Sequence, residues 1–177
     1  MTFPIVGVLG SGRDEHAERA EPLGRWLATQ PVHLLTGGGS GVMTSVSRAF
    51  AGVPDRVGLV VGIIPGDFKD GDYVAPEGYP NRWVELTIRT HLPLSGTSGT
   101  EAMSRNHLNV LSADVLVALP GGAGTASELQ LARRYRRAVI AFVDDPTEIP
   151  GLPAGIPTTS NLAEVRTFVK SHLRSSD

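Results

Sequence analysis

Residues 115–128 read Val-Leu-Val-Ala-Leu-Pro-Gly-Gly-Ala-Gly-Thr-Ala-Ser-Glu. Five apolar residues are followed at once by a glycine-rich turn and then by residues that can form a helix. A short, continuously apolar run is typical of a strand buried on both faces of a parallel sheet. Glycines after such a strand let the backbone approach a ligand closely, and the N–H groups at the start of the next helix favour an anion. The stretch therefore predicts a strand, a ligand-binding turn and a helix.

The same pattern recurs along the chain. Apolar runs that predict buried strands cover residues 5–9, 32–35, 59–64, 115–119 and 139–143. Stretches that can form helices lie between or after them, at about residues 16–30, 42–51, 99–111, 125–137 and 161–173. Strands that alternate with helices predict an α/β fold, a doubly wound and mostly parallel sheet flanked by helices. With no linker or repeat in view, we expect one domain over residues 1–177.

Three of the predicted strands end in glycine clusters. The clusters are Gly10-Ser11-Gly12, Thr-Gly-Gly-Gly-Ser-Gly at 36–41, and Pro-Gly-Gly-Ala-Gly-Thr at 120–125. Ligands of open α/β sheets bind beyond the carboxyl ends of the strands, so three such loops on one edge predict a phosphate or similar anion. The simpler alternative is that the glycines only make tight turns. No G-x-G-x-x-G and no G-x-x-x-x-G-K-[ST] motif is present, which disfavours dinucleotide dehydrogenases and P-loop NTPases.

Composition narrows the function further. The 177 residues include 21 glycines, no cysteine, and a formal charge of −2. The absence of cysteine excludes disulfides, thiol nucleophiles and cysteine-ligated metals, and the five histidines show no metal-binding spacing. The near-balanced charge argues against bulk nucleic-acid binding. With no visible secretory signal and no apolar run long enough for a membrane helix, we expect a soluble, cytoplasmic protein.

The segment from residue 103 to residue 128 resembles the LOG (Lonely Guy) family of Rossmann-like nucleotide-binding proteins, whose hallmark is P-G-G-x-G-T-x-x-E. The motif matches throughout at Pro120, Gly121, Gly122, Gly124, Thr125 and Glu128. Arg105, fifteen residues before Pro120, stands where that family has the arginine of an R-K pair. The loops at 10–11 and 36–43 are similar to the family's first and second glycine loops.

This resemblance implies that the chain binds a nucleoside 5′-monophosphate and cleaves its N-glycosidic bond, giving free base and ribose 5-phosphate without a required cofactor. It implies phosphate or nucleotide contacts at Gly10, Ser11, Gly38, Gly39, Gly121, Gly122, Gly124 and Thr125. Glu128 and Arg105 are the expected catalytic residues, because a carboxylate can stabilise positive charge on the ribose and arginine suits an anion or the departing base. Related proteins also predict a homodimer or higher homo-oligomer.

Two features are closer to another branch of the same superfamily. Asn106 stands where the hydrolases usually have lysine, and the predicted helix after Glu128 is short. Both features resemble the molybdenum cofactor carrier proteins, which hold a pterin phosphate without turnover. The alternative function is therefore a molybdopterin carrier. The lysine decarboxylase label used for some members does not suit this chain, because neither Lys69 nor Lys170 adjoins a glycine loop.

Structural alternatives exist for the two expected catalytic residues. Thr125 and Glu128 have the spacing of a capping box that would tie off the first turn of a helix. Arg105 could instead form a surface salt bridge. Residues 65–82, rich in glycine and proline, predict a long loop that either covers the ligand, together with residues 92–100, or stands in solvent.

Overall fold

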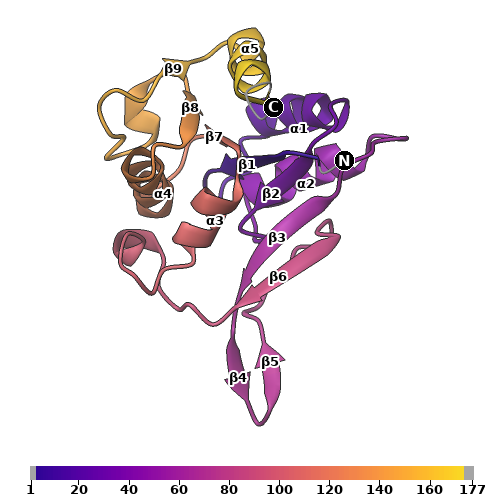
Figure 1. Ribbon diagram of the computed structural model, residues 1–177, viewed down its shortest axis with the longest axis vertical. Coiled ribbons are helices and arrows are strands. Elements are labelled where there is room, and N and C mark those ends of the chain that lie inside the picture. Colours follow the sequence, from indigo (N-terminus) through magenta and orange to yellow (C-terminus); the bar gives the residue numbers. More distant parts are fainter. Residues whose placement is uncertain (1–2, 174–177) are drawn as a thin grey trace.

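The computed structural model describes residues 3–173, and its centre is a seven-stranded parallel sheet (Figure 1). The strands lie in the order β6(Leu86–Thr90), β3(Val60–Pro65), β2(His33–Thr36), β1(Ile5–Leu9), β7(Val115–Ala118), β8(Ala138–Phe142) and β9(Thr158–Thr159). Every neighbouring pair is parallel. The predicted doubly wound α/β fold is confirmed.

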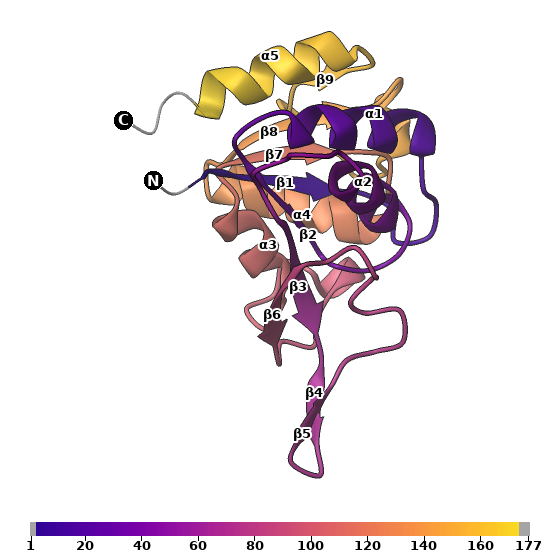
Figure 2. The same ribbon diagram turned by 90° about the vertical axis from the view of Figure 1, so that its right-hand side faces the viewer.

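Helices cover both faces of this sheet (Figure 2). One face carries α1(Ala17–Ala28), α2(Val42–Ala51) and α5(Leu162–Leu173); the other carries α3(Asn106–Ser112) and α4(Ala123–Arg134). Successive strand residues point to opposite faces. Leu34 accordingly packs in the cluster with Phe50 of α2, whereas Leu35 packs in the cluster with Leu129 of α4. These two buried layers explain why the strands read as continuous apolar runs.

The predicted strands and helices are all present, with shifted ends. The helix expected from residue 99 begins at Asn106, because residues 94–105 form turns and the short 3₁₀ helix η1(Gly96–Ser98). The short strands β6 and β9 were not predicted. β9 has only two residues, and β6 exposes four of its five side chains, so neither shows a buried apolar run.

Residues 65–82 are not simply a long loop. They include a hairpin of β4(Asp67–Lys69) and β5(Asp72–Val74), which projects away from the sheet in Figures 1 and 2. Asp70 and Gly71 join its strands with φ of 53° and 91°. An Asp-Gly pair with two positive φ angles is the preferred two-residue hairpin turn, so the sequence held a signal for it.

The order of the strands determines where a ligand can bind. The chain runs outward from β1 through β2 and β3 to β6, and then returns to β7 on the other side of β1. The loops that follow β1 and β7 therefore diverge to opposite sides and leave a crevice between them.

Within residues 3–173, no helix is long and apolar enough to cross a membrane.

Candidate functional site

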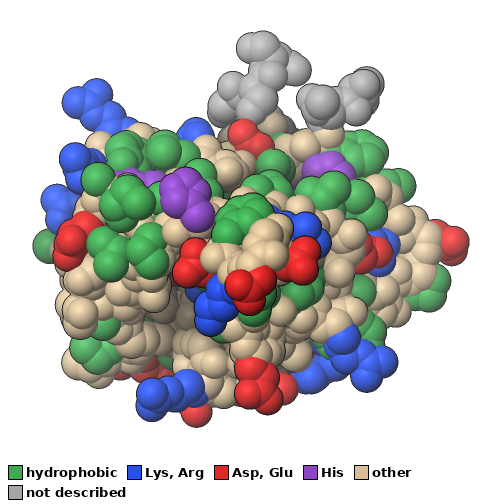
Figure 3. Space-filling view, turned by 90° about the horizontal axis from the view of Figure 1, so that it is seen from below, with side chains coloured by type: hydrophobic (Ala, Val, Ile, Leu, Met, Phe, Trp, Pro, Cys, Tyr) green, Lys and Arg blue, Asp and Glu red, His purple; other side chains and the backbone are tan. Residues whose placement is uncertain are grey.

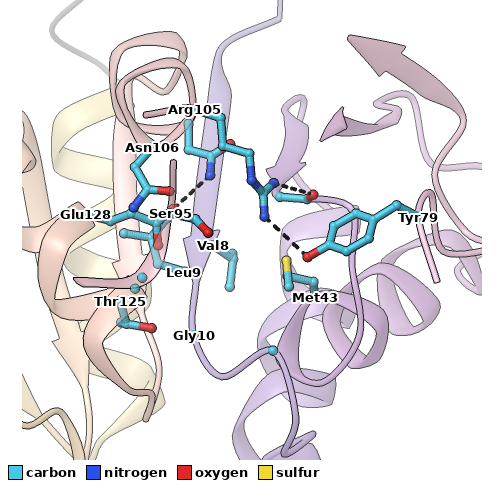
Figure 4. Close-up of a pocket in the computed structure, with 15 residues that line it drawn as sticks. Val8, Leu9, Gly10, Met43, Tyr79, Ser95, Arg105, Asn106, Thr125 and Glu128 are labelled. Carbon is cyan, nitrogen blue, oxygen red and sulfur yellow. Dashed lines mark hydrogen bonds between the residues drawn. The ribbon is translucent and has the colours of Figure 1, made fainter. Parts of the chain in front are cut away.

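A cleft opens at this crevice, with about 590 Å³ of atom-free space including its mouth. Its lining comes from β1 and the loop after it, the loop after β2, α2, the segment before β6, η1, α3 and α4. The lining residues are Val8, Leu9, Gly10, Gly12, Gly37, Met43, Tyr79, Ser95, Gly96, Arg105, Asn106, Asn109, Gly124, Thr125 and Glu128 (Figure 4).

The start of α4 forms one wall of the cleft. Gly122 is the N-cap residue, and the first intrahelical hydrogen bond runs from the Ala126 N–H to the Gly122 carbonyl at 3.1 Å. The N–H groups of the preceding turn, which includes Gly124 and Thr125 of the lining, therefore lie before the hydrogen-bonded part of the helix. Together with the helix dipole they favour an anion at this wall.

Gly121 and Gly122 do not line the cleft, but Gly121 shapes it. A β-carbon at Gly121 would lie 2.3 Å from the Thr125 hydroxyl oxygen and 2.9 Å from the Ser11 nitrogen. The Gly121 N–H is already used, since it donates to the Glu148 carbonyl at 3.1 Å. Gly121 therefore permits the third glycine loop to close against the first.

The first glycine loop contributes Gly10 directly and Ser11 indirectly. A β-carbon at Gly10 would meet Val42 at 2.8 Å, so only glycine lets α2 approach this closely. The Ser11 N–H donates to the Pro120 carbonyl at 2.9 Å, which ties the first loop to the third. The Ser11 hydroxyl accepts from the Arg13 and Asp14 N–H groups, and Ser11 does not line the cleft.

The second glycine loop reaches the cleft only through Gly37. Gly38, at φ 76°, donates its N–H to the Thr36 hydroxyl at 3.1 Å. The carbonyls of Gly38 and Gly39 accept from Asn81 at 2.7 and 2.9 Å. Gly38 and Gly39 thus hold the segment before β6 in place, and the structure does not bring them to the cleft.

Arg105, at the N-cap of α3, crosses the cleft toward β2 and β3 rather than forming a salt bridge (Figure 4). Its Nη1 donates to the carbonyls of Gly37 and Ile63, each at 3.0 Å. Its Nη2 donates to the Tyr79 hydroxyl at 3.3 Å, and the guanidinium carbon lies 5.3 Å from the centre of the Tyr79 ring. Several of its donors are therefore used within the protein.

Glu128 lies at the floor of the cleft and is only 8% exposed. The capping-box interpretation is wrong, because α4 begins earlier, with Gly122 as its N-cap and no side-chain cap. Burial raises the pKa of Glu128 to about 7, against the opposing effects of a hydrogen bond from Asn109 and the charge of Arg105. A carboxyl with a pKa near neutrality in a cleft is typical of functional sites.

Sequence reasoning missed Asn109 and gave Asn106 no role beyond marking a branch. Asn109 Nδ2 donates to Glu128 Oε1 at 2.7 Å. Asn109 Oδ1 and Asn106 Nδ2 are buried without a hydrogen-bond partner. The three-residue spacing of these asparagines places them on one helix face, and that spacing was a usable signal.

Several other side chains lie outside the cleft lining. His107 contacts the Tyr135 hydroxyl and the Glu101 carbonyl, Lys69 lies on the hairpin, and Lys170 lies on α5. Among residues 3–173, no group of three or more His, Asp or Glu side chains is arranged to hold a metal ion. Seen from the hairpin's end, acidic, basic and apolar side chains are interspersed on that face (Figure 3).

Two known proteins are similar to this chain in sequence. An uncharacterised protein of Archaeoglobus fulgidus is 30% identical over 154 residues, which cover 86% of this chain and 87% of that protein. A cytokinin riboside 5′-monophosphate phosphoribohydrolase of Rhodococcoides fascians is 30% identical over 125 residues. That match covers 70% of this chain and 54% of the enzyme.

Solved structures match over nearly the whole chain. The Moco carrier protein of Chlamydomonas reinhardtii has a TM-score of 0.73 at 28% identity, covering 98% of this chain and 99% of that one. The molybdenum cofactor binding protein of Rippkaea orientalis has a TM-score of 0.69 at 30% identity, covering 97% and 98%. The SLOG cluster4 family model matches residues 3–165. With that match and the glycine loops gathered around β1, the chain belongs to the SLOG cluster4 family of LOG-like, Rossmann-like proteins.

Proposed function

We propose that this protein binds the molybdenum cofactor, a pterin phosphate, in the cleft and holds it without turnover. The observation that carries this proposal is the state of Arg105, the only cationic side chain among the described residues of the lining. Its hydrogen bonds to two backbone carbonyls and to Tyr79 make it part of the cleft wall. Because three of its hydrogen bonds are made within the protein, Arg105 has few donors left for a reacting group, which favours a binding role over a catalytic one.

The residues present suit such a cargo. The phosphate would lie against the start of α4, with Gly124 and Thr125 beside it and Gly121 shaping the turn. The pterin ring carries both donors and acceptors, which Glu128 and the cleft-lining asparagines could meet. Similarity to the carrier and cofactor-binding structures covers 97–98% of the chain, which also favours this function.

The test is whether the protein retains and protects this ligand. Protein purified anaerobically from cells that make the cofactor should carry a pterin phosphate that mass spectrometry identifies. Added cofactor should then lose activity to oxygen more slowly with the protein than with an equal amount of albumin. Equal rates of loss, with no pterin in the purified protein, would refute the carrier function.

The second candidate is a nucleoside 5′-monophosphate phosphoribohydrolase, and the pKa of Glu128 favours it. A carboxyl that titrates near pH 7 can exchange a proton at neutral pH, and its ionised form can stabilise positive charge on a ribose. Glu128 and Arg105 are the proposed catalytic residues. A panel of monophosphates, including N6-modified adenosine monophosphates, should then release free base, and Glu128→Ala should abolish release while binding persists. No release from any of them would rule out this activity.

We also propose that the protein is a homodimer or higher homo-oligomer in which β6 faces a second copy. Leu86 and Ile88 of β6 pair with Val61 and Ile63 of β3 and lie on the same sheet face. The β3 side chains are buried beneath the helix layer, whereas Leu86 and Ile88 are 44% and 41% exposed. The same strand of a second copy, related by a two-fold axis, would bury both apolar edges at once.

A further inference from the structure

One buried hydrogen bond joins the two helices that frame the cleft floor. Asn109 Nδ2 of α3 donates to Glu128 Oε1 of α4 at 2.7 Å. The two residues are 4% and 8% exposed, so little water can compete for this contact. Among residues 3–173, no other side chain donates a hydrogen bond to the Glu128 carboxyl.

The other end of the Asn109 amide has no partner. Its Oδ1 is buried and makes no hydrogen bond. The amide is therefore oriented by Glu128 alone, and turning it by half a rotation would fill the same space with nitrogen and oxygen exchanged. A carboxylate only accepts hydrogen bonds, whereas a carboxylic acid also donates one. Asn109 can accordingly donate from Nδ2 to the carboxylate or accept at Oδ1 from the acid.

We propose that Asn109 is a positioning residue that holds Glu128 in both of its ionisation states and sets the pH range in which the cleft accepts an anionic ligand. As the pH falls, Glu128 takes one proton from water and the Asn109 amide turns to accept the new O–H group. A neutral Glu128 no longer repels a phosphate-bearing ligand, so affinity rises. The effect on affinity rests on the proposed binding function, whereas the effect on Glu128 does not.

The surroundings of Glu128 leave few competing influences. Arg105 from the start of α3 is the charged group that acts on it, and it favours the ionised form. His107, on the same helix, is engaged with the Tyr135 hydroxyl and the Glu101 carbonyl. The residues of η1 and β8 that pack near α4 are uncharged. Burial disfavours the charged carboxylate and raises the pKa of Glu128, whereas the hydrogen bond from Asn109 lowers it.

The titration of Glu128 in the ligand-free, full-length protein tests whether Asn109 acts on Glu128. Carboxyl carbon shifts of ¹³C-labelled glutamate should show Asn109→Leu raising the pKa of Glu128 by about one unit. The variant loses both bonds, and the charge-assisted bond that Asn109 donates to the carboxylate is stronger than the bond it accepts from the neutral acid. Val110→Ala, at the next buried position of α3, should weaken the fold without moving this pKa. An unchanged pKa in folded Asn109→Leu would overturn the proposal.

A second variant covers the case in which Asn109→Leu does not fold. Asn109→Asp keeps the shape and places two carboxyl groups in contact, so the pair should release its protons in two well-separated steps. A Glu128 titration that Asn109→Asp leaves in place would also overturn the proposal.

The effect of Glu128 on ligand affinity is measured with adenosine and guanosine 5′-monophosphates as probes. Their affinity should fall as Glu128 ionises, and Asn109→Leu should move that fall upward by about one pH unit, as it moves the pKa. Binding whose pH dependence stays in place while the pKa moves would overturn the link to the ligand. If neither nucleotide nor cofactor binds although the pKa moves, binding in the cleft is refuted and the role of Asn109 toward Glu128 stands.

Discussion

Replacing Glu128 with glutamine should stabilise this protein at alkaline pH. The carboxyl is 8% exposed, and its pKa in the folded chain is about 7 against an ordinary value of 4.5. Each unit of difference corresponds to about 1.4 kcal/mol, so ionising Glu128 costs the folded state about 3 kcal/mol. Glutamine keeps an oxygen that can accept from Asn109 and carries no charge at any pH.

The sign follows from proton binding in the two states. Below pH 4.5 both the folded and the unfolded chains hold the proton, so Glu128 adds no pH dependence there. Between pH 4.5 and about 7 only the folded chain holds it, and the free energy of unfolding falls as the pH rises. Above pH 7 the loss is complete. The advantage of Glu128→Gln should therefore grow from near zero at pH 4.5 to about 3 kcal/mol at pH 8.

Urea denaturation of both proteins from pH 4.5 to pH 8 measures this difference. Glu77→Gln, which removes one carboxylate from an exposed position, is the matched control and should follow the parent protein. Equal stability of Glu128→Gln and the parent protein at pH 8 would refute the reasoning, because it would mean that the buried carboxyl ionises freely in the folded state.

Three further predictions concern the cleft wall, the glycine turn and the edge strand. Arg105→Met should lower the free energy of unfolding by about 2 kcal/mol in urea, because two backbone carbonyls lose their donor; an unchanged midpoint would contradict this. Gly121→Ala should weaken binding of the tightest ligand found by about tenfold in calorimetry, because its β-carbon would displace Thr125. Gly122→Ala, with no atom within 4 Å, should bind normally, and equal losses would count against the argument. Ile88→Lys should lower the mass found by light scattering to that of a monomer, and an unchanged oligomer would exclude β6 as the interface.

The sequence was sufficient for the central part of the fold. Strands buried on both faces leave continuous apolar runs, and β1, β2, β3, β7 and β8 were all visible for that reason. Strands with exposed side chains do not form continuous apolar runs, so β6 and β9 could not be predicted and are seen only in the structure. The hairpin turn at Asp70 and Gly71 was readable, because its signal is local.

For the site, the sequence by itself determined the glycine turn before α4, and its resemblance to the LOG-family motif singled out Arg105 and Glu128, since that motif is a matter of local spacing and residue type. Only the tertiary structure decided what these side chains contact. Whether Arg105 binds carbonyls or a ligand, and whether Glu128 is capped or buried against Asn109, depends on elements far apart in the chain. Burial, and with it the pKa of Glu128, arises from the packing of α3 against α4, which no stretch of sequence contains by itself.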